Sequence, residues 1–225
     1  MASNPQILSD LRVIQEAGHQ IELLTTYKGV PFICRAIIDE IREESIIVKA
    51  QDACMVCLGK DKKPRVLGSD YFEPSVAKVV SLDLQSGEIE LGNFTYIGTK
   101  LGERMLIRVE PGDPIAVNIL SEKQQSSGQI VDISINGIGV RIGAADYNPT
   151  LKPGTIVRAQ FRLNNGEIDL AGTVLSAFRI DDAYRLSIRF NQNGPQKMII
   201  FRYLIDRRAE IAKELEAAYQ ASKNA

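Results

Sequence analysis

The sequence contains only one histidine and three cysteines. With His19 as the only imidazole and no nucleophile–base set, phosphate loop or acid–base carboxylate pair, we do not expect an enzyme. An odd number of cysteines without the spacing of a disulfide framework is typical of a reducing compartment. No apolar run is long enough to span a membrane, and residues 1–5 lack the regions of a secretory signal. These absences predict a cytoplasmic protein without a membrane span.

The sequence also has no large excess of positive or negative charge. Lysine and arginine total 27, aspartate and glutamate total 28, and the net charge is −1 at pH 7. A protein that binds DNA or an anionic membrane over a large surface usually has a net basic face, so these partners are not expected. A local basic pocket is still compatible with this charge balance. The length of 225 residues, with 44% hydrophobic residues, suits two smaller domains or one large one.

The spacing of Cys54 and Cys57 is the one pattern that could suggest a metal or redox site. We expect a strand at residues 54–58, and residues three apart on a strand point to opposite faces. Only Cys34 and His19 remain as further soft ligands, and no second paired-ligand module is present. We therefore expect no metal and interpret Cys54 and Cys57 as small buried apolar residues.

The first half of the chain predicts a short entry helix followed by a small barrel. Apolar residues recur at helical spacing over 7–16, after a serine or asparagine that can cap the helix. Short alternating runs separated by turn residues then predict about six strands, enough for a small barrel. These strands are expected at residues 21–23, 30–38, 45–49, 54–58, 75–84 and 88–96.

The second half repeats this organisation after a charged connection. Turn sequences flanked by alternating runs predict a six-stranded antiparallel barrel, and a helical period begins at residue 195 and can exceed 25 residues. The strands are expected at residues 115–120, 128–135, 138–142, 155–163, 168–178 and 184–190. The fold class is thus mainly β, with two small antiparallel β-barrels in tandem and a C-terminal α-helix.

The domain boundaries follow from this pattern. We expect an N-terminal barrel with its entry helix at 1–97, an interdomain linker at 98–113, and a barrel with a long helix at 114–225. The first part of the helix is expected to cap the barrel. Its second part either pairs with another subunit, which would give a homodimer, or stays solvated.

The stretch of residues 128–137 carries the polar residues of a candidate ligand pocket. Strict alternation would place Val131, Ile133 and Ile135 toward a core, and Asp132 and Ser134 on the other face. The carboxylate and the hydroxyl would then face solvent or a ligand, just before a glycine that allows the backbone to turn. Taken alone, the pattern is equally compatible with an ordinary hairpin.

Two arginines upstream of this stretch complete the candidate ligand pocket. Arg104 and Arg108 lie in the expected linker, and both can face one dianion, because they stand roughly 13 Å apart on an extended chain and roughly 6 Å apart on a helix. The chain resembles the PilZ domain in two signatures, R-x-x-x-R at residues 104–108 and D/N-x-S-x-x-G at residues 132–137. The resemblance covers roughly residues 98–210, and either signature alone would be weak.

This resemblance implies a bacterial receptor for the second messenger cyclic di-GMP. Arginine can pair with phosphate oxygens, reach guanine O6 and N7, or stack on a purine. Asp132 can accept hydrogen bonds from guanine N1–H and N2–H, Ser134 can add one hydrogen bond, and Gly137 permits close approach. The implied ligand-binding residues are therefore Arg104, Arg108, Asp132, Ser134 and Gly137, with no catalytic residue, metal or cofactor.

The first half is similar in layout to the barrel that precedes the PilZ domain in flagellar-brake-type proteins. A ligand that ties linker to barrel could reorient the two domains and signal to a protein partner, in motility, biofilm or polysaccharide control. The partner could be flagellar, polysaccharide-synthetic or regulatory.

Two positions depart from the family pattern. Glu103 stands where many members have a further arginine, which favours one ligand molecule per site, and Ser187 stands where many have a glycine in the last strand. The alternative is therefore a degenerate PilZ scaffold that binds proteins and not the nucleotide.

Overall fold

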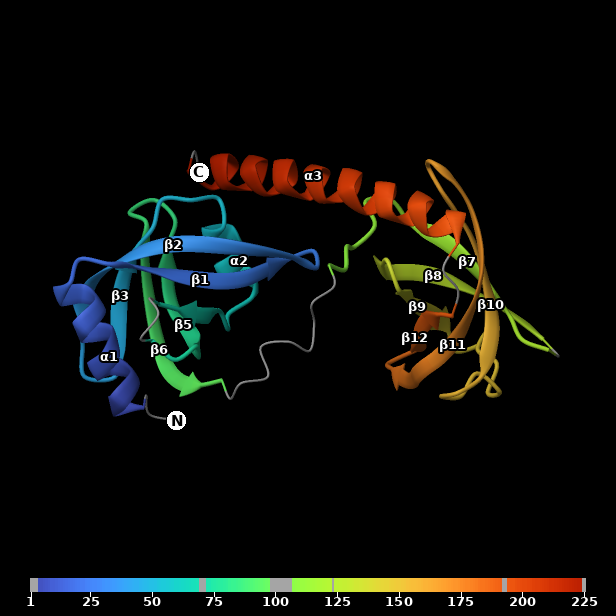
Figure 1. Ribbon diagram of the computed structural model, residues 1–225, viewed down its shortest axis with the longest axis horizontal. Coiled ribbons are helices and arrows are strands. Elements are labelled where there is room, and N and C mark those ends of the chain that lie inside the picture. The colour runs from blue at the N-terminus through green and yellow to red at the C-terminus, as the bar shows by residue number, and fades with distance from the viewer. Residues whose placement is uncertain (1–3, 69–71, 98–106, 123, 192–193, 224–225) are drawn as a thin grey trace. The chain divides into compact units, whose positions relative to one another are not determined.

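The computed structural model describes residues 4–68, 72–97, 107–122, 124–191 and 194–223. Contacts divide the chain into two compact units, residues 1–105 with 211–225, and residues 106–210. Each unit contains a closed six-stranded antiparallel barrel, and a long helix ends the chain (Figure 1). The expected fold class is confirmed, whereas the boundaries drawn from the sequence remain a prediction.

The first barrel has the strand order β1-β2-β3-β6-β5-β4 and closes through pairing of β4 with β1. Inward-facing side chains such as Ile21, Leu23, Ile46, Ile89 and Leu91 are fully buried and form its core. The strands are β1 (Gln20–Tyr27), β2 (Val30–Ile41), β3 (Ser45–Lys49), β4 (Arg65–Leu67), β5 (Ser75–Asp83) and β6 (Glu88–Tyr96).

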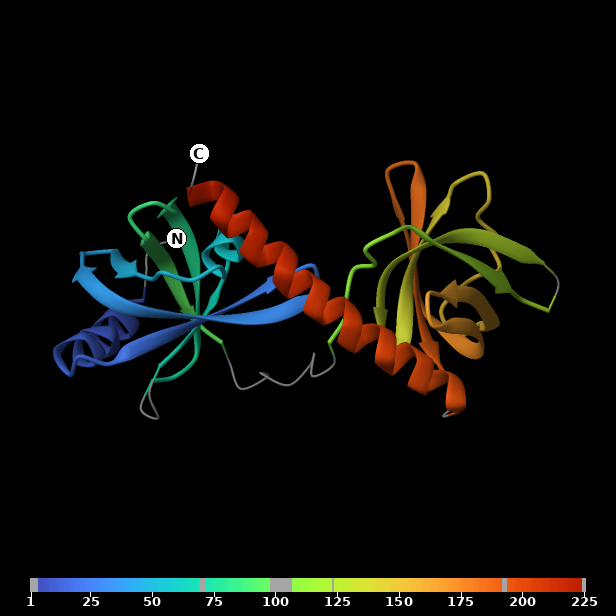
Figure 2. The ribbon, with the colours of Figure 1, turned by 90° about the horizontal axis from the view of Figure 1, so that it is seen from above.

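Helix α1 (Pro5–Glu16) precedes this barrel, as the sequence predicts. Asn4 caps it by accepting a hydrogen bond from the backbone N–H of Gln6, and Pro5 occupies the first turn, where its missing N–H costs nothing. Its buried face packs on β1, β2 and β6, and the helix lies beside these strands in both views (Figure 1, Figure 2). The helix thereby covers apolar surface of the first barrel.

The strand expected at residues 54–58 is wrong. This segment forms the short helix α2 (Met55–Lys60), and the fourth strand of the barrel is β4, which begins five residues after this helix ends. Asp52 starts the helix, because its backbone carbonyl accepts from the N–H of Met55 and its side chain accepts from the N–H of Cys54. A short apolar run fits a buried helix as well as a strand, so periodicity could not separate the two.

The cysteines also differ from expectation. Cys34 on β2 and Cys54 at the start of α2 form a disulfide with a Cα–Cα distance of 5.5 Å. Cys57 is a buried free thiol whose pKa burial raises to about 12, which keeps it protonated and unreactive. Cys54 is therefore cross-linked and not simply a small apolar residue, and the cysteine count no longer supports a reducing compartment. In the described part of the chain, no cluster of three or more potential metal-ligating side chains occurs.

The second barrel has the strand order β10-β11-β12-β9-β8-β7 and closes through pairing of β7 with β10. Its core includes Ile119, Ile133, Val140, Val174 and Leu186, which are all fully buried. The strands are β7 (Ile115–Leu120), β8 (Gln125–Ser134), β9 (Gly137–Gly143), β10 (Ile156–Leu163), β11 (Gly166–Ile180) and β12 (Ala183–Phe190).

Helix α3 (Pro195–Lys223) has 29 residues, which confirms the long C-terminal helix. In the second unit its inner side chains, including Ile200 and Tyr203, are buried, whereas Ile211, Leu215 and Tyr219 are buried in the first unit. A homodimer through the helix stays a prediction, and it would have to use other side chains. Among the described helices, none has the length and apolar character needed to cross a membrane.

The disulfide can be tested by counting thiols. The chain, purified without reductant and unfolded in denaturant, should show one reactive thiol, from Cys57, and three after reduction. Reduction should also lower the free energy of unfolding by about 3 kcal/mol, because the bridge closes a loop of about 20 residues in the unfolded chain. Three reactive thiols before reduction would show that the bridge does not form.

Candidate functional site

The candidate site is built around Asp132 on β8. The pairing of β8 with β9 shifts register between Ile130 and Asp132, which marks a β-bulge at Val131. Because the bulge adds a residue, Ile130 and Ile133 are both buried, whereas Val131, which strict alternation placed toward the core, is only half-buried. The Asp132 side chain is 18% exposed at the barrel surface.

Ser134 and Gly137 close the turn between β8 and β9. The Ser134 hydroxyl donates to the carbonyl of Gly137 at 3.1 Å, and Ser134 is buried, contrary to the expectation that it faces outward. A Cβ on Gly137 would collide with the carbonyl oxygen of Ile188 on β12. Gly137 is thus needed where β9 passes β12, and the close approach is between two strands.

Arg108 is brought to Asp132 by a short backbone pairing. Val109 is fully buried and forms an isolated antiparallel bridge with Ile133, with N–H to O distances of 2.9 and 3.0 Å in the two directions. The neighbouring Arg108 places Nη1 3.5 Å from Oδ1 of Asp132, and its side chain remains 50% exposed. The structure therefore brings together one arginine and the aspartate of the two predicted signatures.

Arg185 on β12 is a second cationic partner of Asp132. Its Nη2 donates a hydrogen bond to Oδ2 of Asp132 and forms an ion pair with it. Gly139 on β9 lies between them, because it pairs with Asp132 on one side and with Ser187 on the other. A Cβ on Gly139 would lie 2.6 Å from both the Arg185 nitrogen and Oδ2 of Asp132. The missing side chain is what lets the guanidinium cross the strand.

The carboxylate of Asp132 thus has two unlike oxygens. Oδ2 is held by Arg185, whereas Oδ1 is buried and accepts no hydrogen bond from the described residues, although Arg108 approaches it within ion-pair distance. The guanidinium groups of Arg108 and Arg185 flank this half-buried carboxylate and provide the opposite charge. Oδ1 of Asp132 is therefore an acceptor that a hydrogen-bond donor of a ligand could use.

The remaining predicted residues are only partly placed. Arg104 and the departure at Glu103 lie outside the described residues. Ser187 is half-buried on β12 and pairs with Gly139 on β9. The serine that stands in place of the family's glycine therefore lies beside the Asp132–Arg185 contact. Asn136 in the turn accepts a hydrogen bond from Nζ of Lys197 on α3.

Sequence reasoning missed Arg185 and Gly139. A glycine inside an otherwise apolar strand such as residues 138–142 indicates close approach of another group. Arg185 lies two positions before Ser187, so both side chains are on the same face of the strand. The departure from the family pattern at Ser187 therefore marked a face that also carries Arg185. Neither signal says which strand crosses which, because this depends on the register of three strands.

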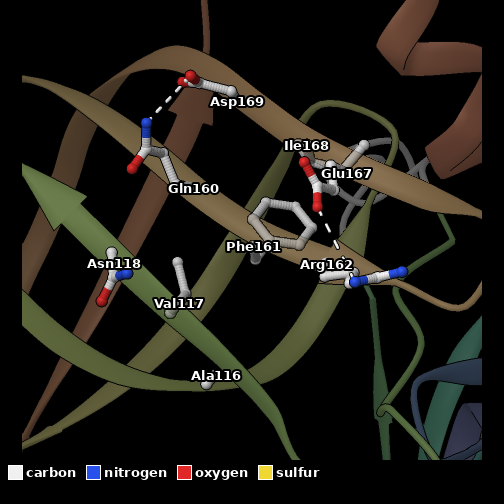
Figure 3. A pocket seen from close by; sticks show the side chains of 9 residues that line it. All are labelled: Ala116, Val117, Asn118, Gln160, Phe161, Arg162, Glu167, Ile168 and Asp169. Atoms are coloured by element: carbon white, nitrogen blue, oxygen red, sulfur yellow. Dashed lines mark hydrogen bonds and ion pairs between the residues drawn. The ribbon is translucent and has the colours of Figure 1, made fainter.

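A hollow of about 440 Å³ elsewhere on the second barrel is a weaker candidate (Figure 3). It is lined by residues of β7, β10 and β11, whereas Arg108, Asp132 and Arg185 belong to other segments. Its acidic side chains already have partners, since Asp169 pairs with Arg158 and Gln160, and Glu167 with Arg162. These pairs leave it less suited to an anionic ligand than the Asp132 site.

Comparisons with known proteins match the second barrel and a larger part of the chain. The family model described as the PilZ domain matches residues 107–206. An uncharacterised protein of Aquifex aeolicus is 27% identical over 183 residues, which are 77% of this chain and 83% of that protein.

Solved structures give fainter likenesses. YcgR from Escherichia coli in complex with c-di-GMP is 16% identical over 96% of each chain, with a TM-score of 0.46. The K. pneumonia MrkH–c-di-GMP complex is 15% identical over 94% of this chain and 97% of that chain, with a TM-score of 0.49. At such scores, these two likenesses carry no weight for the function.

The role of Gly139 gives a direct test of the site geometry. Gly139→Ala should lower the free energy of unfolding by about 1–3 kcal/mol, because its Cβ would push Arg185 away from Asp132. Gly143→Ala on the same strand is the control, since its Cβ would meet only an ordinary contact, 3.5 Å from Asp146, and should change stability by less than about 0.5 kcal/mol. Equal effects of the two substitutions in urea unfolding would contradict the crossing of β9 by Arg185.

Proposed function

We propose that the protein is a receptor for cyclic di-GMP, because the family model described as the PilZ domain matches residues 107–206. The dinucleotide binds between the arginines at positions 104 and 108 and the barrel face that carries Asp132, Ser134 and Gly137. This site binds and does not catalyse, and its proposed residues hold the ligand through phosphate contacts and one guanine contact. No resident cofactor is part of the proposal.

The observation that supports the proposal most is the free acceptor on Asp132. Its Oδ1 is buried without a hydrogen bond from the described residues, and it lies at the edge of a barrel beside an exposed arginine. Guanine presents N1–H and N2–H side by side, a donor pair that fits a carboxylate and that adenine does not offer. In this proposal a guanine supplies the hydrogen-bond donor that Oδ1 lacks among the described residues.

Arg108 supplies the phosphate contact in this proposal. Its guanidinium is half exposed and reaches Asp132 only at 3.5 Å, so it can turn to a ligand phosphate without losing a hydrogen bond to that carboxylate. A guanidinium pairs well with phosphate oxygens in a forked arrangement. Arg104 is proposed to join it from the other end of the R-x-x-x-R signature.

Ser134 and Gly137 act differently from the simplest reading of the motif. The Ser134 hydroxyl donates a hydrogen bond to the Gly137 carbonyl, so its oxygen can still accept a hydrogen bond from a ligand hydroxyl or N–H. Gly137 keeps the turn close to β12 and so fixes the height of the Asp132 carboxylate at the barrel surface. Both residues thus serve the ligand through the shape of the turn.

The proposed signal is a change in how the two units are held. Both arginines belong to the linker that the sequence predicts at residues 98–113, so a ligand bound by both would restrain this connection. The reoriented units would then be recognised by a protein partner, in motility, biofilm or polysaccharide control. A cytoplasmic location, where this second messenger is made available, belongs to the same proposal.

Calorimetric titration with cyclic di-GMP tests the function. The protein should bind at micromolar concentration, and Arg108→Ala should weaken binding about tenfold or more, because a charge-assisted phosphate contact is lost. Arg162→Ala is a matched control, since this arginine on β10 is 82% exposed and pairs only loosely with Glu167 at 4.0 Å. It should leave the affinity unchanged.

Two results would contradict the proposal in different ways. Full affinity in the double variant with Arg104→Ala and Arg108→Ala would overturn the site but keep the function. No binding by the wild-type protein would overturn the function and favour the degenerate scaffold that recognises proteins.

A further inference from the structure

Arg207 on α3 is a buried arginine in the second unit, where its side chain is only 3% exposed. Its Nε donates to the backbone carbonyl of Glu110 at 2.9 Å, and Nη1 pairs with Glu210 at 3.0 Å. Placing a guanidinium out of water is costly unless it is paired and hydrogen-bonded. These bonds offset that cost and fasten α3 to the chain around Glu110.

The surroundings of Arg207 are shaped to receive it. Gly112 lies against the guanidinium, and a Cβ there would stand 3.2 Å from Nη1. Tyr203, one turn earlier on the helix, is buried beside it, and burial raises the pKa of its hydroxyl. A hollow of about 250 Å³ next to the guanidinium is lined by Asp113 and Tyr203 among others. The segment around Glu110 therefore rests on a built contact and not on a chance surface pair.

The position of this contact along the chain gives it a consequence for the site. Glu110 follows Val109, whose backbone is paired with Ile133, and Val109 follows Arg108. The backbone after Arg108 is thus fixed at two successive residues. Val109 is hydrogen-bonded to β8, and Glu110 is hydrogen-bonded to Arg207 of α3. Losing the second hold would let the backbone that carries Arg108 move relative to β8.

Helix α3 also contacts the turn between β8 and β9. Lys197, in its first turn, donates to the side chain of Asn136 at 3.2 Å, within the turn that contains Ser134 and Gly137. Lys197 and Arg207 are ten residues apart, or about 15 Å along a helix. One helix therefore contacts both the turn and the arginine segment of the site.

We propose that Arg207 is a positioning residue for the cyclic di-GMP site, which sets the place of Arg108 through the carbonyl of Glu110. This inference rests on the proposed function. It assigns to α3 a part in ligand affinity that neither signature of the sequence contains. Arg207 does not touch the ligand, so its effect must pass through Arg108.

A double-mutant cycle with Arg108 tests this dependence by calorimetry on the full chain. Arg207→Met keeps the length of the side chain without its donors, and it should weaken cyclic di-GMP binding about tenfold in the wild-type background. In the Arg108→Ala background the same change should cost less than about twofold, because the group it positions is gone. Arg208→Met is the control, since Arg208 is exposed on the same helix, and it should have no effect in either background.

Hydrogen exchange in the ligand-free protein provides a second readout. Arg207→Met should speed exchange of the Val109 N–H, which bonds to Ile133, relative to amides in the β8–β9 ladder. If Arg207→Met does not fold, Arg207→Lys keeps the charge but loses the Nε donor, and the same cycle applies to it.

The outcomes separate this inference from the function. Wild-type binding with unchanged affinity in Arg207→Met would overturn the positioning role and leave the receptor standing. An equal loss in both backgrounds would also overturn it, because Arg207 would then act independently of Arg108. No binding by the wild-type protein would overturn the receptor, and the positioning role with it.

Discussion

The position of the Asp132 carboxylate is the constraint on which the rest of the site depends. A half-buried carboxylate is unfavourable without partners, and here Arg185 and Arg108 provide the compensating charge. Arg185 can reach it only because Gly139 has no side chain. One oxygen is thereby fixed, and the other accepts no hydrogen bond from the described residues, which is the acceptor that the proposed ligand would use.

The fold contributes by fixing the backbone on each side of this carboxylate. A bulge at Val131 lets Ile130 and Ile133 both face the core, with Asp132 at the barrel surface, and the Val109–Ile133 bridge places Arg108 beside Asp132. Helix α3 then supports the arginine segment through Arg207. Pre-organisation of this kind lowers the entropy lost on binding, which is where a rigid barrel is more useful than a loop.

Much of this could be read from the sequence, since alternation and turn residues predicted both barrels, and a helical period of apolar residues predicted α3. The strand expected at 54–58 failed, because a short apolar run fits a helix equally well. The bulge at Val131 and the reach of Arg185 over Gly139 were missed for a different reason. They depend on the register of neighbouring strands, which no local pattern encodes.

The central claim is that cyclic di-GMP binds at the Asp132 carboxylate and its arginines. Titration of the labelled protein with this ligand, followed by NMR, tests it most directly. The account predicts the largest shift changes at the backbone amides of Arg108, Asp132, Gly139 and Arg185, with saturation at one ligand per chain. Shift changes centred on the hollow lined by β7, β10 and β11, or no changes at all, would contradict it.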